Sequence, residues 1–347
     1  MNKKIIALAV AMLPAAAMAD VTIYGAIKAG VESVKAGDAG AVTNVDDIGS
    51  RIGFKGSEDL GNGLKAIWQV ESKLSIDGQN ADGTYSNGKG SNVWASRDSF
   101  VGFAGDFGSV KIGKLSTYGN SSLESLDTWE YGSKAAGFGT YYRNDGRFNN
   151  AVRYDSPDLA GLTFAAVYGF DEAEGSANKW NIGGTYAFSN MFVGADYLQQ
   201  DAKVGTDSKQ FRLEGGVDAN DLYVALSYQY TESQGGEASW VADFADQTTL
   251  DAIADAKVKT NEAGLTVAYT VDRFVPKFSY AKGWDAKIDG DKASDSGYDQ
   301  WIVGVDYKFS KRTIAGLQYG QIKFDAGSDA GVNGDEKAVS FNVVHKF

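Results

Sequence analysis

The chain ends with the stretch KAVSFNVVHKF, residues 337–347, in which apolar and polar side chains alternate. One side carries Val339, Phe341, Val343, His345 and Phe347. Alternation with a period of two is typical of a β-strand with one apolar face. Because the ends of soluble chains are usually polar and frayed, an apolar strand that ends on an aromatic residue indicates a C-terminus held in a sheet.

The same alternation recurs along most of the chain. Its apolar sets include Val21, Ile23, Ile27 and Val31; Leu64, Ala66, Trp68 and Val70; Leu162, Phe164, Ala166 and Tyr168; Leu222, Val224, Leu226, Tyr228 and Tyr230; and Trp301, Val303, Val305, Tyr307 and Phe309. The composition also favours strands, because the 347 residues include 43 glycines, 43 aromatic residues and only 3 prolines. The sequence therefore predicts an all-β protein.

The N-terminus has the pattern of a secretory signal peptide. Lys3 and Lys4 precede an apolar run from Ile5 to Leu13, and Ala17-Met18-Ala19 supplies the small residues of a cleavage site. The run is too short to span a bilayer. We expect residues 1–19 to be removed and residues 20–347 to form one domain, which changes the formal charge from −12 to −14 because two lysines are lost.

The composition excludes several kinds of protein and site. With no cysteine, an exported chain has no disulfide framework, thiolate metal site or cysteine nucleophile. The acidic balance argues against nucleic acid as a partner. Acidic segments such as 285–299 and 325–336 do not follow the EF-hand spacing, so neither a metal site nor a cofactor is expected.

A β-sandwich and a membrane β-barrel both show alternation, but two features favour the barrel. Aromatic residues gather near predicted strand ends, where an interfacial girdle would lie: Trp68, Trp180, Tyr186, Phe188, Tyr230, Tyr307 and Phe309. Tight turns also alternate with long hydrophilic connections. The turns are at 105–108, 189–190, 218–221, 271–273 and 310–312, and the connections are at 75–92, 115–148, 232–260, 285–297 and 325–336.

Counting these segments gives about sixteen strands, a size at which a barrel leaves an aqueous channel. A closed barrel has no free edge, so we expect residues 337–347 to pair with residues 21–31. The prediction is a 16-stranded antiparallel transmembrane β-barrel.

Several stretches resemble the trimeric general porins of Gram-negative bacteria, especially the neisserial and β-proteobacterial type. They are DVTIYG (20–25), SRIGFKGSEDLGNGLKAIWQVE (50–71), RDSFVGFAGDFGSVKIGK (97–114), AVRYDSPDLAGL (151–162) and the terminal HKF. The resemblance implies a general diffusion porin of the outer membrane, whose third long loop folds into the barrel. It also implies that Phe347 belongs to the signal read by the outer-membrane assembly machinery.

Function in such a barrel depends on the side chains that face the lumen. If Ile52 and Phe54 face lipid, the residues next to them in the chain face the lumen. The same alternation, here called parity, predicts that Phe100 faces lipid and that Arg97 faces the lumen. The predicted basic wall comprises Arg51, Arg97, Lys111, Lys28, Lys65 and Lys73. Opposite it, by the resemblance, the third long loop brings Glu124, Asp127 and Glu130, followed by Arg143 and Arg147. Such a constriction filters ions by charge and predicts weak anion selectivity.

Three other functions compete with that of a general porin: a substrate-specific channel, a barrel enzyme and an adhesin. A substrate-specific channel for a sugar or phosphate is one alternative, and a sugar channel would use aromatic residues of the third loop as a slide: Tyr118, Trp129, Tyr131, Phe138, Tyr141 and Tyr142. An inward-folded loop needs such rings for packing in any case, and packing is the favoured interpretation. A barrel enzyme usually needs a histidine beside a serine or an acid. The only histidine, His345, is expected on the outer face of the last strand, so no catalytic residue is predicted. Adhesion through the outer loops would be compatible with any of these.

The resemblance further implies a homotrimer. Gly25, Ala29 and Ala66 on the outer face would allow neighbouring barrels to approach closely. The other expected partners are outer-membrane lipid and lipopolysaccharide, the assembly machinery, and the ions and small hydrophilic solutes that pass through.

Overall fold

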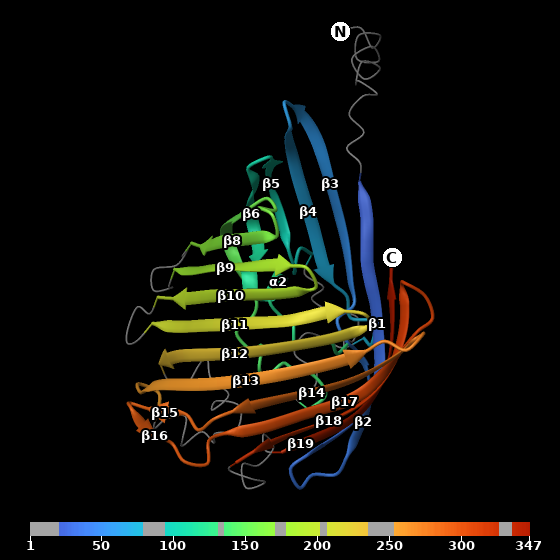
Figure 1. The fold of residues 1–347 in the computed structure, drawn as a ribbon, viewed down its shortest axis with the longest axis vertical. Helices are drawn as coiled ribbons and strands as arrows, with labels where there is room; N and C mark the ends of the chain where they lie inside the picture. The colour runs from blue at the N-terminus through green and yellow to red at the C-terminus, as the bar shows by residue number, and fades with distance from the viewer. Residues whose placement is uncertain are drawn as a thin grey trace, which may run out of the picture.

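The computed structural model describes residues 21–78, 94–130, 135–170, 178–201, 207–234, 253–325 and 335–347. The predicted signal peptide lies outside these residues. The described strands form one antiparallel sheet (Figure 1). They are β1 (Thr22–Ala36), β2 (Val42–Asp47), β3 (Arg51–Gly61), β4 (Leu64–Lys73), β5 (Ser99–Gly105), β6 (Gly108–Ser116), β7 (Arg147–Asp155), β8 (Leu162–Gly169), β9 (Lys179–Phe188), β10 (Met191–Gln200), β11 (Ser208–Ala219), β12 (Leu222–Gln234), β13 (Lys257–Tyr269), β14 (Phe274–Gly283), β15 (Lys287–Ile288), β16 (Asp291–Lys292), β17 (Tyr298–Lys308), β18 (Thr313–Phe324) and β19 (Glu336–Lys346).

Sixteen wall strands result from these nineteen elements in the described part of the chain. Both β2 and β3 pair with β1 and follow one another along it, so they count as one interrupted strand. The two-residue strands β15 and β16 form a small hairpin in the connection between β14 and β17. Strand β1 pairs with β19 from Ala26↔Lys346 to Ala36↔Glu336, which closes the barrel as predicted.

The interruption between β2 and β3 is bridged by side chains. An Asp47 carboxylate oxygen accepts hydrogen bonds from the backbone N–H groups of Gly49 and Ser50, both at 2.9 Å. The Ser50 hydroxyl accepts from Lys28 N–H at 2.9 Å and donates to Lys28 C=O at 3.1 Å. The hydroxyl thus replaces the backbone groups missing from the ladder, which keeps the buried polar atoms of β1 satisfied.

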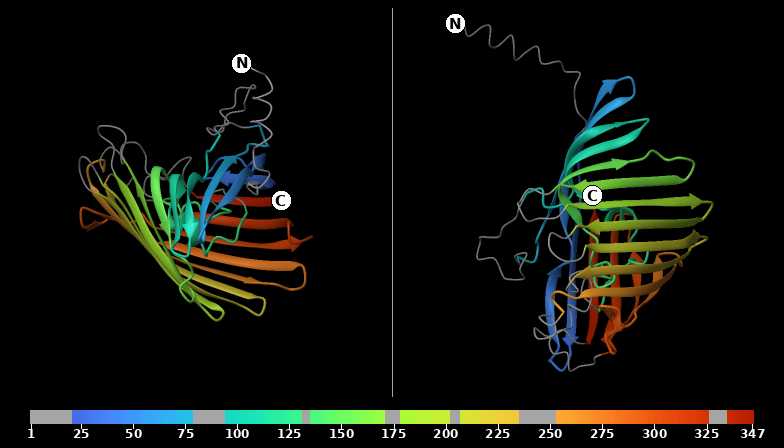
Figure 2. Two further views of the ribbon diagram at one scale, coloured as in Figure 1. Left: turned by 90° about the horizontal axis from the view of Figure 1, so that it is seen from above. Right: turned by 90° about the vertical axis from the view of Figure 1, so that its left-hand side faces the viewer.

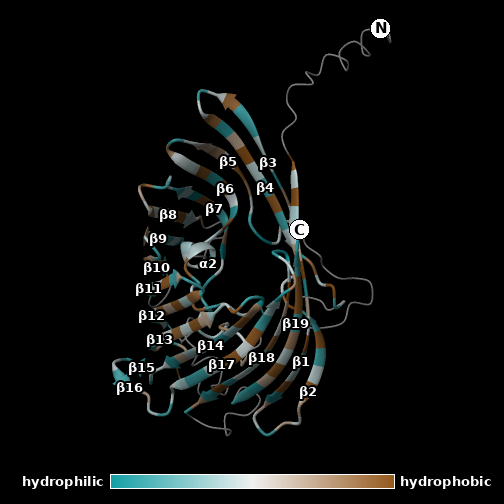
Figure 3. Ribbon diagram, turned by 45° about the vertical axis from the view of Figure 1, so that its right-hand side comes forward, coloured by the Kyte–Doolittle hydropathy of each residue, from teal (hydrophilic) through white to brown (hydrophobic). Residues whose placement is uncertain are grey.

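Burial in the wall is the reverse of that in a soluble protein. Apolar side chains such as Val101 and Leu226 are 62% and 58% exposed on the outer face, whereas Arg212 and Glu262 are fully buried on the inner face. Figure 3 shows the hydrophilic and hydrophobic residues alternating along each strand around the ring. The pattern matches a barrel in lipid, where apolar residues face outward and polar residues line the interior.

The connections differ at the two ends of the barrel, and the start of β1 and Phe347 both lie at the end with the short ones. At this turn end, strands are joined at 62–63, 106–107, 156–161, 189–190, 220–221, 270–273 and 309–312, which confirms the turns predicted from the sequence. At the opposite end, here called the loop end, most of the connections are longer. Figure 2 shows the barrel from two further sides. The third of the loop-end connections, residues 117–146, is called L3; it begins with helix α2 (Tyr118–Ser122), which lies inside the ring (Figure 3).

Within the described residues, no helix is long and apolar enough to cross a membrane.

Candidate functional site

Loop L3 follows the inner wall of the barrel. At its start, Tyr118 N–H donates to the Asn181 side chain on β9 at 2.6 Å. In the middle, the Trp129 indole donates to the Ser279 hydroxyl on β14 at 2.9 Å. Farther on, the Gln300 amide on β17 donates to the carbonyl of Gly137 at 2.6 Å. These contacts confirm that the third long loop folds inward, so the open part of the lumen lies between L3 and strands β3 to β7.

The inner wall is shaped to admit the loop. A Cβ atom on Gly264 would lie 2.2 Å from a Leu126 side-chain carbon, and one on Gly320 would lie 2.0 Å from the carbonyl oxygen of Ala135. Real Cβ atoms do not approach other atoms so closely, so a larger residue at either position would push L3 away from the wall. Glycine here serves the close approach of a second backbone.

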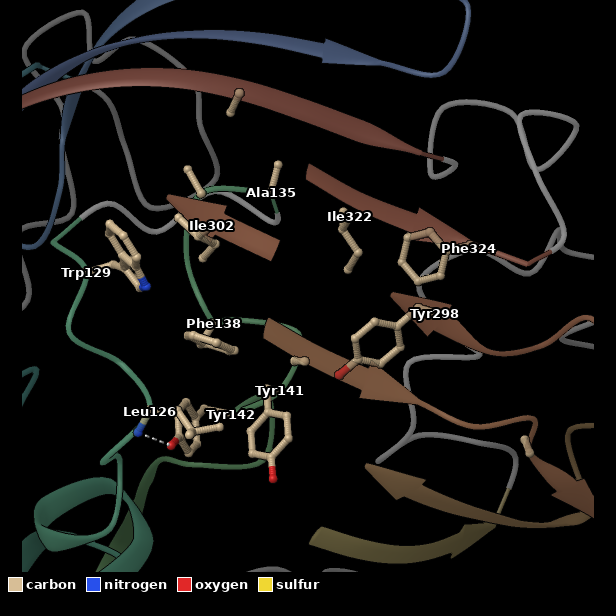
Figure 4. Packing of buried hydrophobic residues seen from close by; sticks show 14 of the residues in the cluster. Leu126, Trp129, Ala135, Phe138, Tyr141, Tyr142, Tyr298, Ile302, Ile322 and Phe324 are labelled. Carbon is tan, nitrogen blue, oxygen red and sulfur yellow. Dashed lines mark hydrogen bonds between the residues drawn. The ribbon is translucent and has the colours of Figure 1, made fainter. Parts of the chain in front are cut away.

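Apolar packing holds the middle of L3 against the wall (Figure 4). Phe138, Tyr141 and Tyr142 are at most 7% exposed and belong to one buried cluster with residues of β12 to β19 such as Ile302. Their rings meet edge to face, with centroids 5.1 Å apart for the Tyr141–Tyr142 pair. Burial of large rings supplies most of the free energy that fixes a loop of this kind.

Buried ion pairs complete the attachment. Arg212, fully buried on β11, donates to both carboxylate oxygens of Asp145 in L3, at 2.6 and 2.9 Å. Glu214 accepts from the Ser125 N–H and the Tyr142 hydroxyl, both at 2.9 Å. Arg143 donates to Glu262 on β13 at 2.8 Å. Removing one partner of a buried pair leaves an uncompensated charge, so these contacts fix L3 in one position.

Strands β3 to β7 and the segment before β5 carry a group of cations, here called the basic wall; one of them, Arg153, is buried and donates to Ser121 at the start of L3 at 3.1 Å. The basic wall comprises Arg51, Lys55, Lys73, Arg97, Lys111, Arg147 and Arg153, all from the segment between β3 and β7. Glu71 forms an ion pair with Arg97 and lies 3.9 Å from Arg51. Asp155 is shared by Lys111 at 2.9 Å and Arg153 at 2.7 Å, and Arg147 lies 3.0 Å from Asp98.

The charges of this wall do not cancel. Its seven cations face three carboxylates, those of Glu71, Asp98 and Asp155, two of which are each shared by two cations. Lys55 lies over the ring of Tyr24, with its ammonium 5.1 Å from the ring centroid. The local balance is therefore positive, although the whole chain is acidic. An ion in the lumen experiences this local balance most strongly, because salt screens the more distant loop charges.

The three predicted acids of L3 differ in their ability to oppose this wall. Glu130 forms an ion pair with Lys28 and lies 3.9 Å from Lys346, so its charge is neutralised locally. Burial acts to raise the pKa of Glu130, but Lys28 outweighs it and holds the pKa below the usual range. Burial and the nearby Asp145 raise the pKa of Glu124 to about 8. At pH 7 most Glu124 is therefore uncharged. Burial raises the pKa of Asp127 only to about 6, so most Asp127 stays charged at pH 7 and is the main anion of L3 that faces the basic wall.

A cavity of about 190 Å³ lies between the basic wall and α2. Its lining includes Lys111 and Arg153 from the wall and Ser121 from the helix. Asp98 also lines it; burial opposes its ionisation, yet Arg147 and Ser116 hold its pKa below the usual range. The cavity is thus bordered by two cationic side chains and by the carboxylate of Asp98, which stays ionised at neutral pH.

The structure corrects one position inferred by parity and shows where Arg143, placed by the resemblance, lies. Phe100 was expected to face lipid, but it faces inward with Gly102, where the Lys111 ammonium lies 5.3 Å from its ring centroid. Strand β5 begins only at Ser99, after a bend at 97–98, so parity cannot be carried across from Arg97. Arg143 lies between L3 and the wall rather than on the open side, because Glu262 holds it there.

The other predicted lumen residues face the interior, at different heights. Lys28 sits at the junction of β1 and L3, bound to Glu130. Lys73 is exposed beside Arg51, its register partner, near the middle of the barrel. Lys65 is in register with Asp59 next to the turn at 62–63, so it lies at the turn end of the barrel, away from L3.

Five of the six aromatic residues considered for a sugar slide are buried against the wall. Tyr118, Trp129, Phe138, Tyr141 and Tyr142 are each at most 7% exposed, and Tyr131 lies outside the described residues. A slide needs ring faces that are open to the solute. These rings instead serve the packing of L3.

The arrangement does not suggest catalysis. His345 is exposed on the outer face at the turn end, where its Nδ1 lies 2.9 Å from the Thr313 hydroxyl. Among the described residues, no group of three or more histidine or acidic side chains is placed to hold a metal ion.

Sequence reasoning missed several residues that shape the lumen, among them Glu71, Arg153, Arg212, Glu214 and Glu262. Parity alone would have placed Arg212 and Glu214 on the inner face, since Phe211 and Leu213 beside them are apolar. Their partners, however, lie in L3, some 67 to 89 residues away along the chain. No local pattern marks such contacts.

Comparison with known proteins agrees with this architecture. A family model described as Gram-negative porin matches residues 6–327. The major outer membrane protein P.IB of Neisseria sicca is 36% identical, over 95% of this chain and 96% of that protein. The P.IB protein of Neisseria lactamica is 35% identical over the full length of both.

Solved structures show the same fold. The anion-selective porin from Comamonas acidovorans superposes with a TM-score of 0.75 at 23% identity, covering 95% of this chain and all of that one. OmpT of Vibrio cholerae, in its trimer form, gives 0.68 at 15% identity, covering 94% and 99%. The chain therefore belongs to the Gram-negative porin family and is a general diffusion porin, a non-enzymatic β-barrel channel of the outer membrane.

Proposed function

We propose that this porin passes ions and small hydrophilic solutes with a weak preference for anions. The observation that carries the proposal is the basic wall, where seven cations are grouped with only three carboxylates. Rings of like charge at a narrow passage favour ions of opposite sign. Glu124 and Glu130 contribute little opposing charge at pH 7, because Glu124 is mostly protonated and Glu130 is paired with Lys28.

A relative supports this sign of selectivity. The Comamonas acidovorans porin with the same fold is described as anion-selective. Within this chain, we assign the constriction to Arg51, Lys73 and Arg97 on one side and Asp127 on the other. Lys111 and Arg147 line the approach to it. Lys28 and Glu130 fix the side of L3, and Lys65 acts at the turn-end mouth.

The test is an ion-selectivity measurement on the purified protein in a planar lipid bilayer. A zero-current potential measured across a KCl gradient of about 0.1 M mean concentration gives the sign directly, because screening at that concentration still leaves charges effective over about 10 Å. The expected sign is that of a chloride-preferring channel. A potassium-preferring potential contradicts the proposal.

We further propose that the protein forms a homotrimer in contact with outer-membrane lipid and lipopolysaccharide, and that residues 1–19 are removed on export. A solved structure with this fold is a trimer form. Phe347 would then mark the last strand for the assembly machinery. Cross-linking of the purified protein tests the trimer, which should give a band at three times the monomer mass. N-terminal sequencing tests the removal of residues 1–19, after which the chain should start at Asp20.

A further inference from the structure

A second cavity, of about 240 Å³, lies at the loop-end side of L3, where the loop meets β7 and β9 to β12. Its volume corresponds to roughly eight water molecules at their share of about 30 Å³ in the liquid, so it suits a small solute. This cavity is separate from the one beside the basic wall that includes Lys111.

The cavity has cationic and neutral polar lining. Arg147 and Lys179 border it at one side, and Lys209 also borders it, although the register with Glu232 places that side chain on the outer face. None of its described lining residues is acidic. Within the described residues, no carboxylate lies within ion-pair distance of Lys179, so this ammonium is available to an anion.

The cavity lining also offers neutral hydrogen-bonding groups. Gln200, Ser208 and Gln210 line the cavity, and Gln210 already accepts from Asn144 at 2.8 Å. Thr231 lies there too, only 1% exposed, and its hydroxyl has no hydrogen-bond partner among the described residues. A buried polar atom without a partner costs free energy, so a solute that hydrogen-bonds to it would gain.

We propose that this cavity is a low-affinity binding site for small hydroxy acids, organic anions with a carboxylate at one end and hydroxyl groups along the body. The carboxylate would lie between Lys179 and Arg147, and the hydroxyl groups would contact the amides and Thr231. Phe148 and Leu198 supply apolar surface for the C–H groups between them. The site deepens the proposed anion preference, because it would concentrate such solutes at the loop-end approach to the constriction.

The experiment measures how three probes added on the loop side reduce the chloride current through single channels. Gluconate carries both charge and hydroxyl groups, hexanoate carries only the charge, and sorbitol carries only the hydroxyl groups. Gluconate is expected to block at the lowest concentration. Lys179→Gln should raise its half-blocking concentration about tenfold, because it removes a charge-assisted hydrogen bond. Thr231→Val should raise it about threefold, as for a neutral hydrogen bond.

Thr260→Val is the matched control. Thr260 is the register partner of Thr231 on β13, equally buried and also without a partner for its hydroxyl among the described residues, but it does not line the cavity. Its block by gluconate should equal that of the unmodified protein. Equal block by gluconate and hexanoate overturns the proposal, as does an equal effect of Thr231→Val and Thr260→Val.

The result can be separated from the test of anion preference. Thr231→Val changes no charge, so the zero-current potential in KCl should stay constant while the gluconate block weakens. A potassium-preferring potential would remove the proposed selectivity but leave the gluconate comparison valid. A chloride-preferring channel in which gluconate and sorbitol block equally would keep the selectivity and overturn this site alone.

Discussion

Gly25 and Phe347 exchange two backbone hydrogen bonds, each 3.1 Å long, and the ring of Phe347 covers the position where Gly25 would carry a side chain. The pair forms the turn-end limit of the seam between the first and last strands. Gly25 was expected to serve close contact between barrels, but its lack of a side chain serves the closure of its own barrel. A Cβ atom there would lie 2.8 Å from the ring and 2.4 Å from the Arg51 carbonyl oxygen.

Substitution of Gly25 by valine should therefore impair closure. We expect a smaller fraction of barrel that resists unfolding in detergent, measured by the mobility shift between heated and unheated samples on a gel. Ala29→Val, on the same face of β1 but away from the ring, is the control and should fold normally. Equal yields of both variants would contradict the role of the seam.

Removing both Arg51 and Arg97 should shift selectivity toward cations. A unit charge about 10 Å from the path of an ion contributes about 0.4 kcal/mol in water, or roughly a twofold change in permeability. Arg51→Ala with Arg97→Ala also frees Glu71, which adds to the shift. The readout is the zero-current potential across a KCl gradient at low salt, and an unchanged potential would show that selectivity is set elsewhere.

Neutralising Glu71 should have the opposite effect. Glu71 is 7% exposed and is the only described carboxylate in ion-pair contact with Arg51 and Arg97. Glu71→Gln keeps the shape and raises the positive charge of the basic wall, so the potential should move farther toward chloride. If both changes shift the potential in the same direction, altered pore geometry rather than charge is responsible.

Selectivity should also depend on pH above neutrality. The pKa of Glu124 is raised to about 8 by burial and by Asp145, so the carboxyl group loses its proton as the pH rises from 7 to 9. This adds negative charge to L3 and should weaken the preference for chloride over that range. Glu124→Gln cannot ionise, so its zero-current potential should stay constant between pH 7 and 9, whereas a parallel change in both proteins would assign the titration to another group.

Loss of one buried ion pair should release L3. Arg212→Met removes the cation but leaves Asp145 buried, a change that typically costs about 3–5 kcal/mol. We expect noisier single-channel currents and faster cleavage of L3 by trypsin. Adding Asp145→Asn removes the unpaired charge and should restore quiet currents in part, whereas no rescue would mean that the arginine acts by packing alone.

The wall of this barrel could be predicted from the sequence because lipid imposes a local rule. Alternation as in the set Leu222 to Tyr230 recurs in many of the wall strands, and turns such as 189–190 separate them. The rule fails where the backbone is irregular, as at the bend before β5, which reversed the inferred side of Phe100. The alternation also gives no information on the height of a residue along the barrel axis. It therefore does not distinguish Lys65 from Arg51, although only Arg51 lies near L3.

The lumen was less predictable because its contacts are long-range. The charge of Glu130 depends on Lys28, about a hundred residues earlier, and the position of Arg143 depends on Glu262, more than a hundred residues later. Sequence could supply the residue types of a basic wall and an acidic loop. It also favoured packing for the aromatic rings of L3. It could not show that Glu130 is neutralised by Lys28 or that Glu124 is largely protonated at neutral pH.

The attachment of L3 also sets an order of events during folding. Its anchors at Asn181, Arg212, Ser279, Gln300 and Glu336 all follow the loop in the chain, and the bond from Ala135 to Glu336 spans 201 residues. Contacts of such long range form late, since the chain between them must first be ordered. The loop therefore has no complete surface to dock on until the last strands are in place. The nascent barrel passes through a wide state, and the narrow passage is its final feature to form.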